Sequence, residues 1–444
     1  MGNGKQAVYK YSGKNTTQLK KLLIISPYFP PSNAADMQRI RMSLPYFKEF
    51  GWDVEVVTVD PAHSEMTKDE LLLKNIPSEI KIHQVQAFEK KWTSKLGLGS
   101  IALRSLWFYK KYVSILLEKH HFDLIYFSTT QFPVMVLGKH WKKKYHIPYV
   151  IDMQDPWHST YYENKPKAER PVKYWFSYRL NKFLEPIAMK NVDGLISVSQ
   201  GYLDTLVERY PNLKNVPKKV ITFGAYEADV ALVKQQHNKF KVAFDNNQAF
   251  THFVYVGRGG ADMKIAAMLL FKAFKIGLKK EFNFFDKVRF HFIGTSYAKN
   301  GEGIKSIKPI ADDLGISKYV HEQTDRISFY TGLFSLKQAD ALVILGSNDK
   351  QYTASKIYPF IMAEKPLLAI FHPESSARKI LELCTNIKVI SLLNRDAESA
   401  VFEDIYAILQ SKTALKINVE NFASYSAKAM TKNQCILFDQ IITN

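Results

Sequence analysis

Short apolar runs alternate with longer amphipathic stretches through the first half of the chain. The apolar runs have strand length and the amphipathic stretches have helix length. Strands are expected at residues 22–25, 53–59, 80–84, 124–127, 148–151, 194–198 and 220–223, and helices at 36–50, 133–145, 171–191 and 200–210. Such alternation predicts βαβ units, and therefore a parallel sheet with helices on both faces.

The same alternation begins again in the second half. Strands are expected at 252–256, 288–293, 319–322, 341–345, 366–370 and 387–390, and helices at 263–279, 326–338 and 374–383. Residues 224–247 are polar and weakly patterned, which suits a linker with room for one helix. The pattern predicts an α/β protein with doubly wound domains at 20–217 and 218–418, and a last helix from 419 to about 442. Residues 1–19 show no apolar face and are expected to be disordered.

Composition fits a folded, multidomain protein. Of the 444 residues, 46% are hydrophobic and 23% are charged, which is enough apolar material for two or three cores. The two cysteines, Cys384 and Cys435, lie in no metal or redox spacing, so a reducing cytoplasmic compartment is expected. The sequence contains no run of eighteen apolar residues and no signal-peptide core, which predicts a soluble or peripheral protein.

A formal net charge of +19 predicts attraction to polyanions: nucleic acid, anionic lipid or phosphorylated substrates. Lysines interleaved with aromatic residues would also suit single-stranded nucleic acid. Most of the aromatic residues lie within the predicted strands and helices, however. Core packing is therefore the favoured interpretation, and no nucleic acid partner is expected.

Residues 90–112 combine cations with large apolar side chains, and two interpretations stay open. The cations are Lys90, Lys91, Lys95, Arg104, Lys110 and Lys111, and the apolar residues are Trp92, Leu98, Ile101, Leu106, Trp107 and Phe108. This composition is typical of a helix that lies in the interface of an anionic membrane. It is equally typical of a helix whose apolar stripe packs on a sheet while its lysines face water.

Residues 351–371 form the richest candidate site. Tyr352, Thr353, Ser355 and Lys356 offer hydrogen-bond donors where a helix should begin, with Ser355 as a candidate N-cap. Free backbone N–H groups at such a helix start favour an anion. The apolar run 366–370 then supplies a buried strand, which places this segment at the ligand-facing corner of a nucleotide-binding domain.

This corner resembles the donor site of retaining GT-B glycosyltransferases of family 4, whose usual pattern is Ser-Lys-x-x-Glu-Tyr-x-x-x-Gly-Lys-Pro. The pattern is kept by Ser355, Lys356, Lys365 and Pro366, with Phe360 in place of its aromatic residue, and it is broken by Pro359 and Glu364. The family also has two glutamates eight positions apart, and those positions hold Gln351 and Pro359 here.

The replaced glutamates predict weak donor binding. The resemblance implies that a glutamate at the position of Pro359 would accept hydrogen bonds from ribose hydroxyls, and proline has no side-chain acceptor. Glu364 lies about 140° further round a helix and cannot replace that carboxylate. If Ser355 is the N-cap, Pro359 also removes an N–H from the first turn and should loosen it. Slow or specialised transfer is therefore expected, with Pro359→Glu tightening donor binding.

A glycine-rich turn at residues 256–260 follows a predicted strand and precedes a predicted helix. Its backbone N–H groups could hold a phosphate. Arg258 and Lys264 resemble the family's Gly-Arg and following Lys, which implies that both cations stabilise a departing diphosphate. The chain contains no Asp-x-Asp sequence, so no metal and no other cofactor is expected.

Two further motifs resemble the family's acceptor side. The proline-rich loop 27–33 follows the first strand and ends at Asn33, and a stiff connection is its alternative interpretation. Asp155 follows the strand 148–151 in a sequence that resembles the family's Arg-Asp-Pro-Trp, with Gln154 in place of arginine. A cap for the next segment is the alternative role of Asp155.

Across nearly the whole chain the resemblance implies the GT-B fold, in which two Rossmann-like domains face a central cleft and the helix within 419–444 crosses back to the first domain. It implies a retaining hexosyltransferase that moves a sugar from a nucleotide diphosphate sugar to a glycan or lipid-linked acceptor. The setting would be bacterial surface polysaccharide biosynthesis at the inner face of the cytoplasmic membrane, where an anionic membrane surface is a candidate partner.

The same resemblance assigns roles to nine residues. Substrate binding is expected of Asn33, Gly257, Gln351, Ser355, Lys356 and Tyr358, and a catalytic role of Asp155, Arg258 and Lys264. A catalytically weakened or nonenzymatic GT-B protein that acts as a binding or scaffold component is the alternative, because both glutamate positions depart from the pattern.

Overall fold

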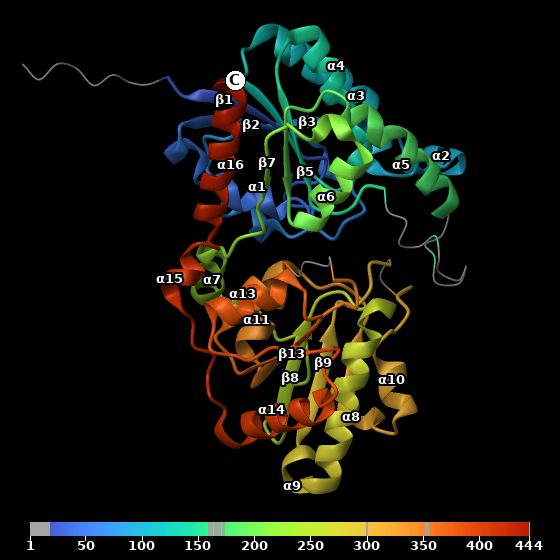
Figure 1. Ribbon diagram of the computed structural model, residues 1–444, viewed down its shortest axis with the longest axis vertical. Helices are drawn as coiled ribbons and strands as arrows, with labels where there is room; N and C mark the ends of the chain where they lie inside the picture. Colours follow the sequence, from blue (N-terminus) through green and yellow to red (C-terminus); the bar gives the residue numbers. More distant parts are fainter. Residues whose placement is uncertain are drawn as a thin grey trace, which may run out of the picture.

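The computed structural model describes residues 18–158, 163, 170, 174–298, 301–350 and 355–443. Two α/β domains lie one above the other along the longest axis of the molecule, and each has a sheet between layers of helices (Figure 1). Of the predicted disordered tail, residues 1–17 lie outside the described part of the chain.

The first sheet has seven strands, all parallel. Their order across the sheet is β3 (Lys81–Val85), β2 (Trp52–Val59), β1 (Lys20–Ile25), β4 (Leu124–Ser128), β5 (Tyr149–Met153), β6 (Gly194–Ser197) and β7 (Lys218–Val220). Along β1, Leu22 and Ile24 pack into one core while Leu23 and Ile25 pack into the other. Both faces of the sheet are buried, which is why its central strands read as continuous apolar runs.

Helices cover both faces of this sheet. The Leu23 face is covered by α3 (Ile101–Lys119), α4 (Val136–Tyr145), α5 (Tyr174–Met189) and α6 (Gln200–Arg209), and the Leu22 face by α1 (Gln38–Ser43) and α16 (Ala427–Thr443). The one helix predicted over 36–50 is wrong, because only α1 and the short 3₁₀ helix Phe47–Phe50 are helical there.

The second sheet has six parallel strands. Their order is β10 (Val320–Gln323), β9 (Val288–Ile293), β8 (Thr251–Val256), β11 (Ala341–Leu345), β12 (Leu367–Phe371) and β13 (Ile390–Ser391). Its helices are α8 (Lys264–Lys280), α9 (Phe282–Phe285), α10 (Lys308–Asp313), α11 (Phe329–Gln338), α12 (Ile357–Ala363), α13 (Ser376–Cys384) and α14 (Ala397–Ser411). Helix α14 was not predicted from the sequence; it packs on α8 and α9, and its Phe402 ring stacks on Phe285.

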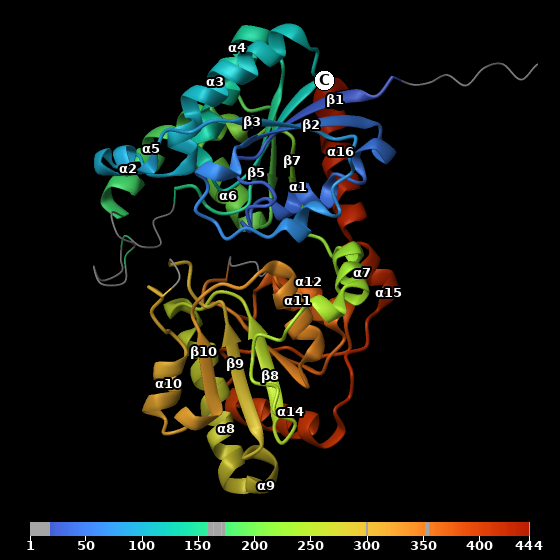
Figure 2. The ribbon, with the colours of Figure 1, turned by 180° about the vertical axis from the view of Figure 1, so that it is seen from behind.

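The chain crosses between the domains twice, and the two crossings lie side by side (Figures 1 and 2). The first leads into α7 (Glu227–Gln235) and the second joins α15 (Val419–Ala423) to α16. Ala225 N donates to Tyr425 O at 2.7 Å, and Ala427 N donates to Ala225 O at 2.7 Å. A Cβ at Gly224 would lie 2.7 Å from Ala427 N, so only glycine fits there.

The return of the last helix to the first domain is confirmed: the ring of Phe438 on α16 lies 5.7 Å from that of Trp52. Two details differ from the sequence-based prediction. The single helix expected from residue 419 is interrupted, because Ser426 accepts a hydrogen bond from Ala429 N and begins α16 as its N-terminal cap. The first sheet also extends past the predicted boundary at Pro217, since β7 pairs with β6.

Beside the crossings, the two domains and α7 meet in a buried charged cluster. Arg41 donates to both carboxylate oxygens of Asp229 at 2.8 and 2.5 Å, and the Tyr330 hydroxyl donates to the same carboxylate at 2.8 Å. Arg41 belongs to the first domain, Asp229 to α7 and Tyr330 to α11. This cluster links the first domain, α7 and α11 through direct hydrogen bonds.

Candidate functional site

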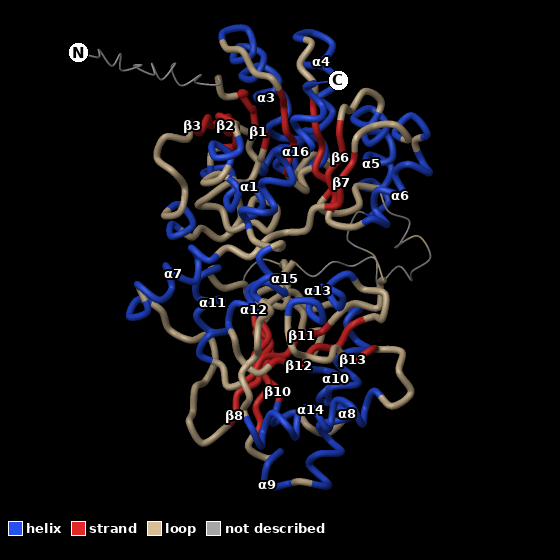
Figure 3. The backbone as a smooth tube through the Cα atoms, turned by 60° about the vertical axis from the view of Figure 1, so that its left-hand side comes forward, coloured by secondary structure: helices blue, strands red, loops and turns tan. Residues whose placement is uncertain are grey.

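A cavity of about 570 Å³ lies between the two domains. The loops that follow β1, β4 and β5 line it on one side, and those that follow β8, β9, β10 and β11 line it on the other. Figure 3 shows loops, in tan, where the two domains face each other. The volume of the cavity is in the range of small-molecule sites, and the carboxyl ends of parallel strands are where α/β sheets bind ligands.

The first-domain wall carries two carboxylates. Asp36 is buried and accepts hydrogen bonds from Thr129 Oγ1 at 2.7 Å and from Thr130 N at 3.0 Å. Burial raises the pKa of the Asp36 carboxyl, and these hydrogen bonds only partly oppose the effect. Asp36 was not anticipated, although its place after the proline-rich loop of the first strand could have suggested it.

Asp155 is the second carboxylate, and the structure places it on the cavity wall as the sequence suggested. The residue is exposed, yet its carboxyl interacts with Asp36 of the first domain and Arg258 of the second and is partly desolvated. This desolvation raises the pKa of Asp155 to about 6, with repulsion from Asp36 adding to the rise and attraction by Arg258 opposing it. A carboxylate with this pKa can exchange a proton near neutral pH.

A buried ion pair supports this wall from behind. Arg39 Nε lies 2.7 Å from Asp152 Oδ2, and both side chains are fully buried. Gln154, at the family's arginine position, donates from Nε2 to Asp152 Oδ2 at 2.9 Å and to Asp36 O at 3.2 Å. Gln154 therefore links the ion pair to the backbone of Asp36.

The second-domain wall begins at the glycine-rich turn after β8. Gly257 lines the cavity with φ +152°, and a Cβ there would lie 3.0 Å from Lys356 Nζ. Lys356 Nζ donates to the Tyr255 hydroxyl and lies 4.5 Å from the centre of the Tyr255 ring. Burial lowers the pKa of Lys356 to about 7, and repulsion from Arg258 adds to this effect less strongly. Attraction by Asp262 opposes the shift.

Arg258 and Lys264, predicted as a pair, have different surroundings. Arg258 lines the cavity and donates to both carboxylate oxygens of Asp262, at 2.9 and 2.8 Å. Burial would raise the pKa of Asp262, but Arg258, together with a hydrogen bond from Ser347, holds that pKa below its usual range. Lys264, the first residue of α8, is exposed and is not among the residues that line the cavity.

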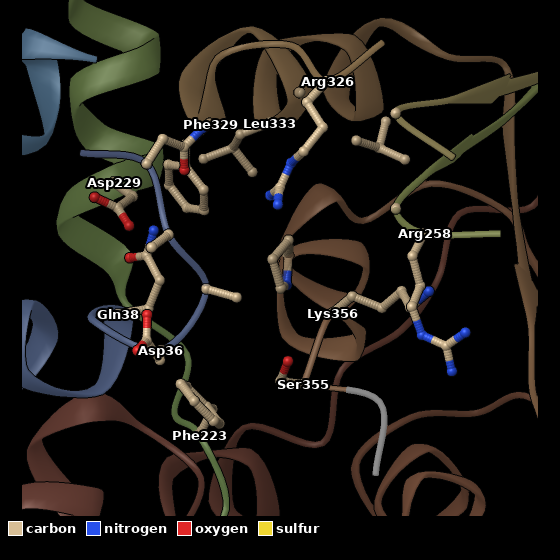
Figure 4. A pocket seen from close by; sticks show the side chains of 18 of the residues that line it. Asp36, Gln38, Phe223, Asp229, Arg258, Arg326, Phe329, Leu333, Ser355 and Lys356 are labelled. Atoms are coloured by element: carbon tan, nitrogen blue, oxygen red, sulfur yellow. The ribbon is translucent and has the colours of Figure 1, made fainter. Parts of the chain in front are cut away.

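Arg326 is a cation that the sequence analysis missed. It lies in the loop after β10, and its side chain points into the cavity (Figure 4). Its guanidinium lies 4.9 Å from the centre of the Tyr297 ring, and no carboxylate of the described chain forms an ion pair with it. Its position directly after the predicted strand 319–322 was the available signal, because that is the ligand-binding edge.

The remaining predicted binding residues divide into three groups. Asn33 and Ser355 line the cavity. Tyr358 does not: it is buried in the second-domain core, and its hydroxyl donates to Thr222 Oγ1 at 2.8 Å. Its role in substrate binding stays a prediction. Gln351 lies outside the described residues, as do Tyr352 and Thr353.

The helix start at the opening of α12 also differs from the prediction. Its N-cap is Lys356 rather than Ser355, and no side chain caps it. Pro359 is therefore the third helical residue, whose N–H has no partner within a helix in any case. The expected loosening of the first turn is wrong for this reason, and the ring of Pro359 instead lines the cavity.

The described residues show neither a metal site nor a membrane-spanning helix. No group of three His, Cys, Asp or Glu side chains in that part of the chain could hold a metal ion. None of the helices that the structure describes is both long and apolar enough to cross a membrane.

Comparison with known proteins confirms the resemblance. Residues 42–222 match the sequence model described as Glycosyltransferase Family 4. A glycosyltransferase from Rickettsia africae superposes with a TM-score of 0.58 at 13% identity, covering 96% of this chain and 99% of that one. An α,α-trehalose-phosphate synthase (UDP-forming) from Burkholderia xenovorans, in complex with glucose-6-phosphate, gives 0.58 at 9% identity and covers 94% and 100%. No curated protein sequence matches the chain significantly.

Anabaena HepE in complex with UDP-glucose gives a TM-score of 0.51 at 15% identity, covering 95% of this chain and 98% of that one. At such identities these similarities establish the fold. The chain therefore has the GT-B architecture that the sequence predicted, with a first domain similar to that of family 4 glycosyltransferases.

Proposed function

We propose that the protein transfers a sugar from a nucleotide diphosphate sugar to a hydroxyl group of a glycan or lipid-linked acceptor, with retention of configuration. The observation that carries the proposal is the division of charge across the cavity. Arg258, Arg326 and Lys356 lie on the second-domain wall, whereas Asp36 and Asp155 lie on the first. A dianionic diphosphate fits the cationic wall, and a neutral polyhydroxyl acceptor fits the other.

Each wall then has a distinct task. The cations bind the donor and stabilise the negative charge that grows on the diphosphate as the bond to the sugar breaks. Gly257 carries no side chain between its backbone and the cavity, so the diphosphate can approach the backbone there, whereas a Cβ would lie 3.0 Å from Lys356 Nζ. Asp155 in its ionised form accepts a hydrogen bond from an acceptor hydroxyl and orients it toward the sugar. It takes the hydroxyl proton as the acceptor oxygen bonds to the sugar and the nucleoside diphosphate leaves.

Turnover is the direct test of transfer. Uridine, guanosine and adenosine diphosphate sugars are each incubated with the protein and a polyhydroxyl acceptor, and release of the nucleoside diphosphate is measured. One of the donors should be consumed, and nuclear magnetic resonance should show that the product has the same anomeric configuration as that donor. An inverted product would contradict retention, and no release from any donor would contradict transfer.

A nonenzymatic binding role is the second candidate, and Pro359 is the observation that favours it. Its apolar ring lines the cavity where the family has a carboxylate for the ribose. Pro359→Glu separates the candidates, because a weakened enzyme should bind the donor several-fold more tightly and turn it over faster. A binding protein should gain affinity without gaining turnover.

A further inference from the structure

We propose that α2 (Lys90–Thr93), α3 and α5 together form a face that docks the protein on an anionic membrane surface. The apolar stripe of α3 is occupied by packing, since Ile101, Tyr109 and Val113 lie in the first-domain core. The tryptophans of this region do not pack there: Trp92 is 66% and Trp107 is 53% exposed. For residues 90–112, the packing interpretation therefore holds for the apolar stripe of α3, and the membrane interpretation concerns the exposed tryptophans.

The new element is α5, which the sequence analysis interpreted only as an amphipathic helix. Trp175 and Phe183 are 64% and 68% exposed. With Arg179 they recur every four residues, so the three side chains lie along one side of the helix. That side points away from the domain core, which α5 contacts through Ala188 and Met189.

α2 and α5 lie side by side on the first domain in both Figures 1 and 2. Gly97, just after α2, lies directly against the ring of Phe176, because a Cβ built on Gly97 would be 3.0 Å from Phe176 Cε1. The Trp107 ring of α3 lies 6.4 Å from the ring of Phe88, two residues before α2. The exposed aromatic residues of α2, α3 and α5 thus belong to one surface. We call this surface, with its cations, the aromatic face.

Cations surround these aromatic rings. Lys95 lies 5.5 Å from the centre of the Trp92 ring, Lys111 lies 5.3 Å from that of Trp107, and Arg179 lies 4.2 Å from that of Trp175. Among the described residues, none of these three cations forms an ion pair. Arg104 is not part of the face, because it is buried and donates to Phe88 O and His63 O.

This chemistry selects the partner. Indole rings partition to the boundary between lipid headgroups and acyl chains, while lysine and arginine next to them bind anionic headgroups. The nearby acids are largely engaged, since Glu65 pairs with Lys90 and Glu118 with Lys144, although Glu89 is exposed. An anionic bilayer therefore satisfies the exposed apolar rings and the unpaired cations together.

Cosedimentation of the full chain with vesicles tests the proposal. The vesicles contain phosphatidylcholine alone or phosphatidylcholine with phosphatidylglycerol. Binding is expected only to the anionic vesicles, and it should weaken as salt rises because the headgroup attraction is screened. Two variants should each weaken binding by at least about tenfold. One is the double change Trp175→Ser with Phe183→Ser. The other is the triple change Lys91→Glu with Lys95→Glu and Lys111→Glu.

The chain offers a matched control at the far end of the second domain (Figure 1). Phe282 on α9 is 56% exposed and follows Lys279 and Lys280, so it has the same chemistry outside the aromatic face. Changing Phe282→Ser with Lys279→Glu and Lys280→Glu should leave binding unchanged. Melting temperatures verify that each variant folds, and the triple charge variant tests the face if the aromatic variant does not fold.

Tryptophan fluorescence supplies a readout of insertion. Lipids with brominated acyl chains quench indoles that reach them, and Trp92, Trp107 and Trp175 should be quenched while the buried Trp52 and Trp141 are not. The triple change of the exposed tryptophans to phenylalanine should remove the quenching.

The proposal would be overturned if the protein did not bind anionic vesicles at low salt, or if it bound neutral vesicles equally well. An equal loss of vesicle binding in the control variant would also overturn it. So would displacement of the vesicles by a single-stranded oligonucleotide that binds more tightly. None of these measurements needs turnover. Docking can therefore fail while transfer stands, and transfer can fail while docking stands.

Discussion

Asp36 and Asp155 are the carboxylates on the first-domain side of the cavity, and Arg258, Arg326 and Lys356 are the cations on the second-domain side. Asp229 of α7 also lines the cavity, but its carboxylate is paired with Arg41. Both walls are built by loops at the carboxyl ends of parallel strands, so the fold alone does not explain the difference. Burial acts on both in the same direction, toward the neutral form: the pKa of Asp155 rises to about 6 and that of Lys356 falls to about 7.

This comparison indicates how the two walls would respond to substrate. A diphosphate next to Lys356 would restore the charge that burial disfavours, so donor binding and protonation of Lys356 should be coupled. The diphosphate would lie on the opposite wall from Asp155, so this carboxylate stays available to an acceptor hydroxyl. The donor and acceptor tasks can therefore be separated by substitution and by pH.

The largest effect is expected on the carboxylate wall. Asp155→Asn should lower kcat by roughly 10²–10⁴-fold, because the amide keeps the shape but cannot accept a proton. Donor affinity and melting temperature should stay near the wild-type values. Activity of the wild type should rise as the pH increases through about 6, where Asp155 loses its proton. If melting temperature and activity drop together in the variant, the residue serves as a structural cap instead.

The next effect concerns the cationic wall. Arg326→Gln should weaken binding of the nucleoside diphosphate by about 1.5–3 kcal/mol, the usual range for a charge-assisted hydrogen bond, and leave the nucleoside nearly unaffected. Arg258→Ala should act in the same way but less strongly, because Asp262 already neutralises part of its charge.

Lys264→Gln is the matched comparison for Arg326→Gln, since it removes an exposed cation that does not line the cavity. Its loss of diphosphate affinity should be clearly smaller. Calorimetric titrations of both variants decide between the two assignments. A loss at Lys264 as large as that at Arg326 would favour the pair of Arg258 and Lys264 that the sequence pattern suggested.

A smaller effect should come from pH. Lys356 has a pKa of about 7 in the free protein, so it is mostly charged at pH 6 and mostly neutral at pH 8. Because the charged form binds the diphosphate, donor affinity should fall about tenfold over that interval. Lys356→Gln should bind more weakly and lose this pH dependence. A wild-type affinity that does not change between pH 6 and pH 8 would contradict the coupling.

The smallest effect is on the stability of the turn behind the cationic wall. Glu364 ends α12 with φ +58°, a conformation that glycine adopts without strain. This is the glycine position of the family pattern. Glu364→Gly should raise the free energy of unfolding by about 1 kcal/mol, because the exposed glutamate side chain loses few contacts. Denaturant titration measures the change, and a lower stability would show that Glu364 makes contacts that offset the strain.

The sequence predicted the fold better than the site, for physical reasons. Strands such as β1 and β11 are buried on both faces, and their unbroken apolar runs make them visible. Helix ends depend on single hydrogen bonds, so the cap assigned to Ser355 was wrong by one residue, and with it the strain assigned to Pro359. α14 was missed, although Val401, Phe402 and Ile405 give it an apolar side.

The site residues required knowledge of tertiary contacts. Tyr358 and Lys356 are two positions apart, yet one enters the core and the other the cavity, because neighbouring residues on a helix face different directions. The difference between Arg258 and Arg326 depends on Asp262, whose carboxylate is available to only one of them. No sequence pattern reports which cation remains unpaired.

Binding of the donor to the cationic wall is the central claim, and one calorimetric experiment tests it most directly. The experiment uses three series, based on uridine, guanosine and adenosine, and each series contains the nucleoside, its diphosphate and its diphosphate sugar. Each compound is titrated into the wild type and into the double variant Arg326→Gln with Lys356→Gln. One diphosphate series should bind the wild type far more tightly than its nucleoside does, and the double variant should reduce it to the affinity of the nucleoside. Equal affinity of nucleoside and diphosphate for the wild type, or an unchanged diphosphate affinity in the double variant, would contradict the account.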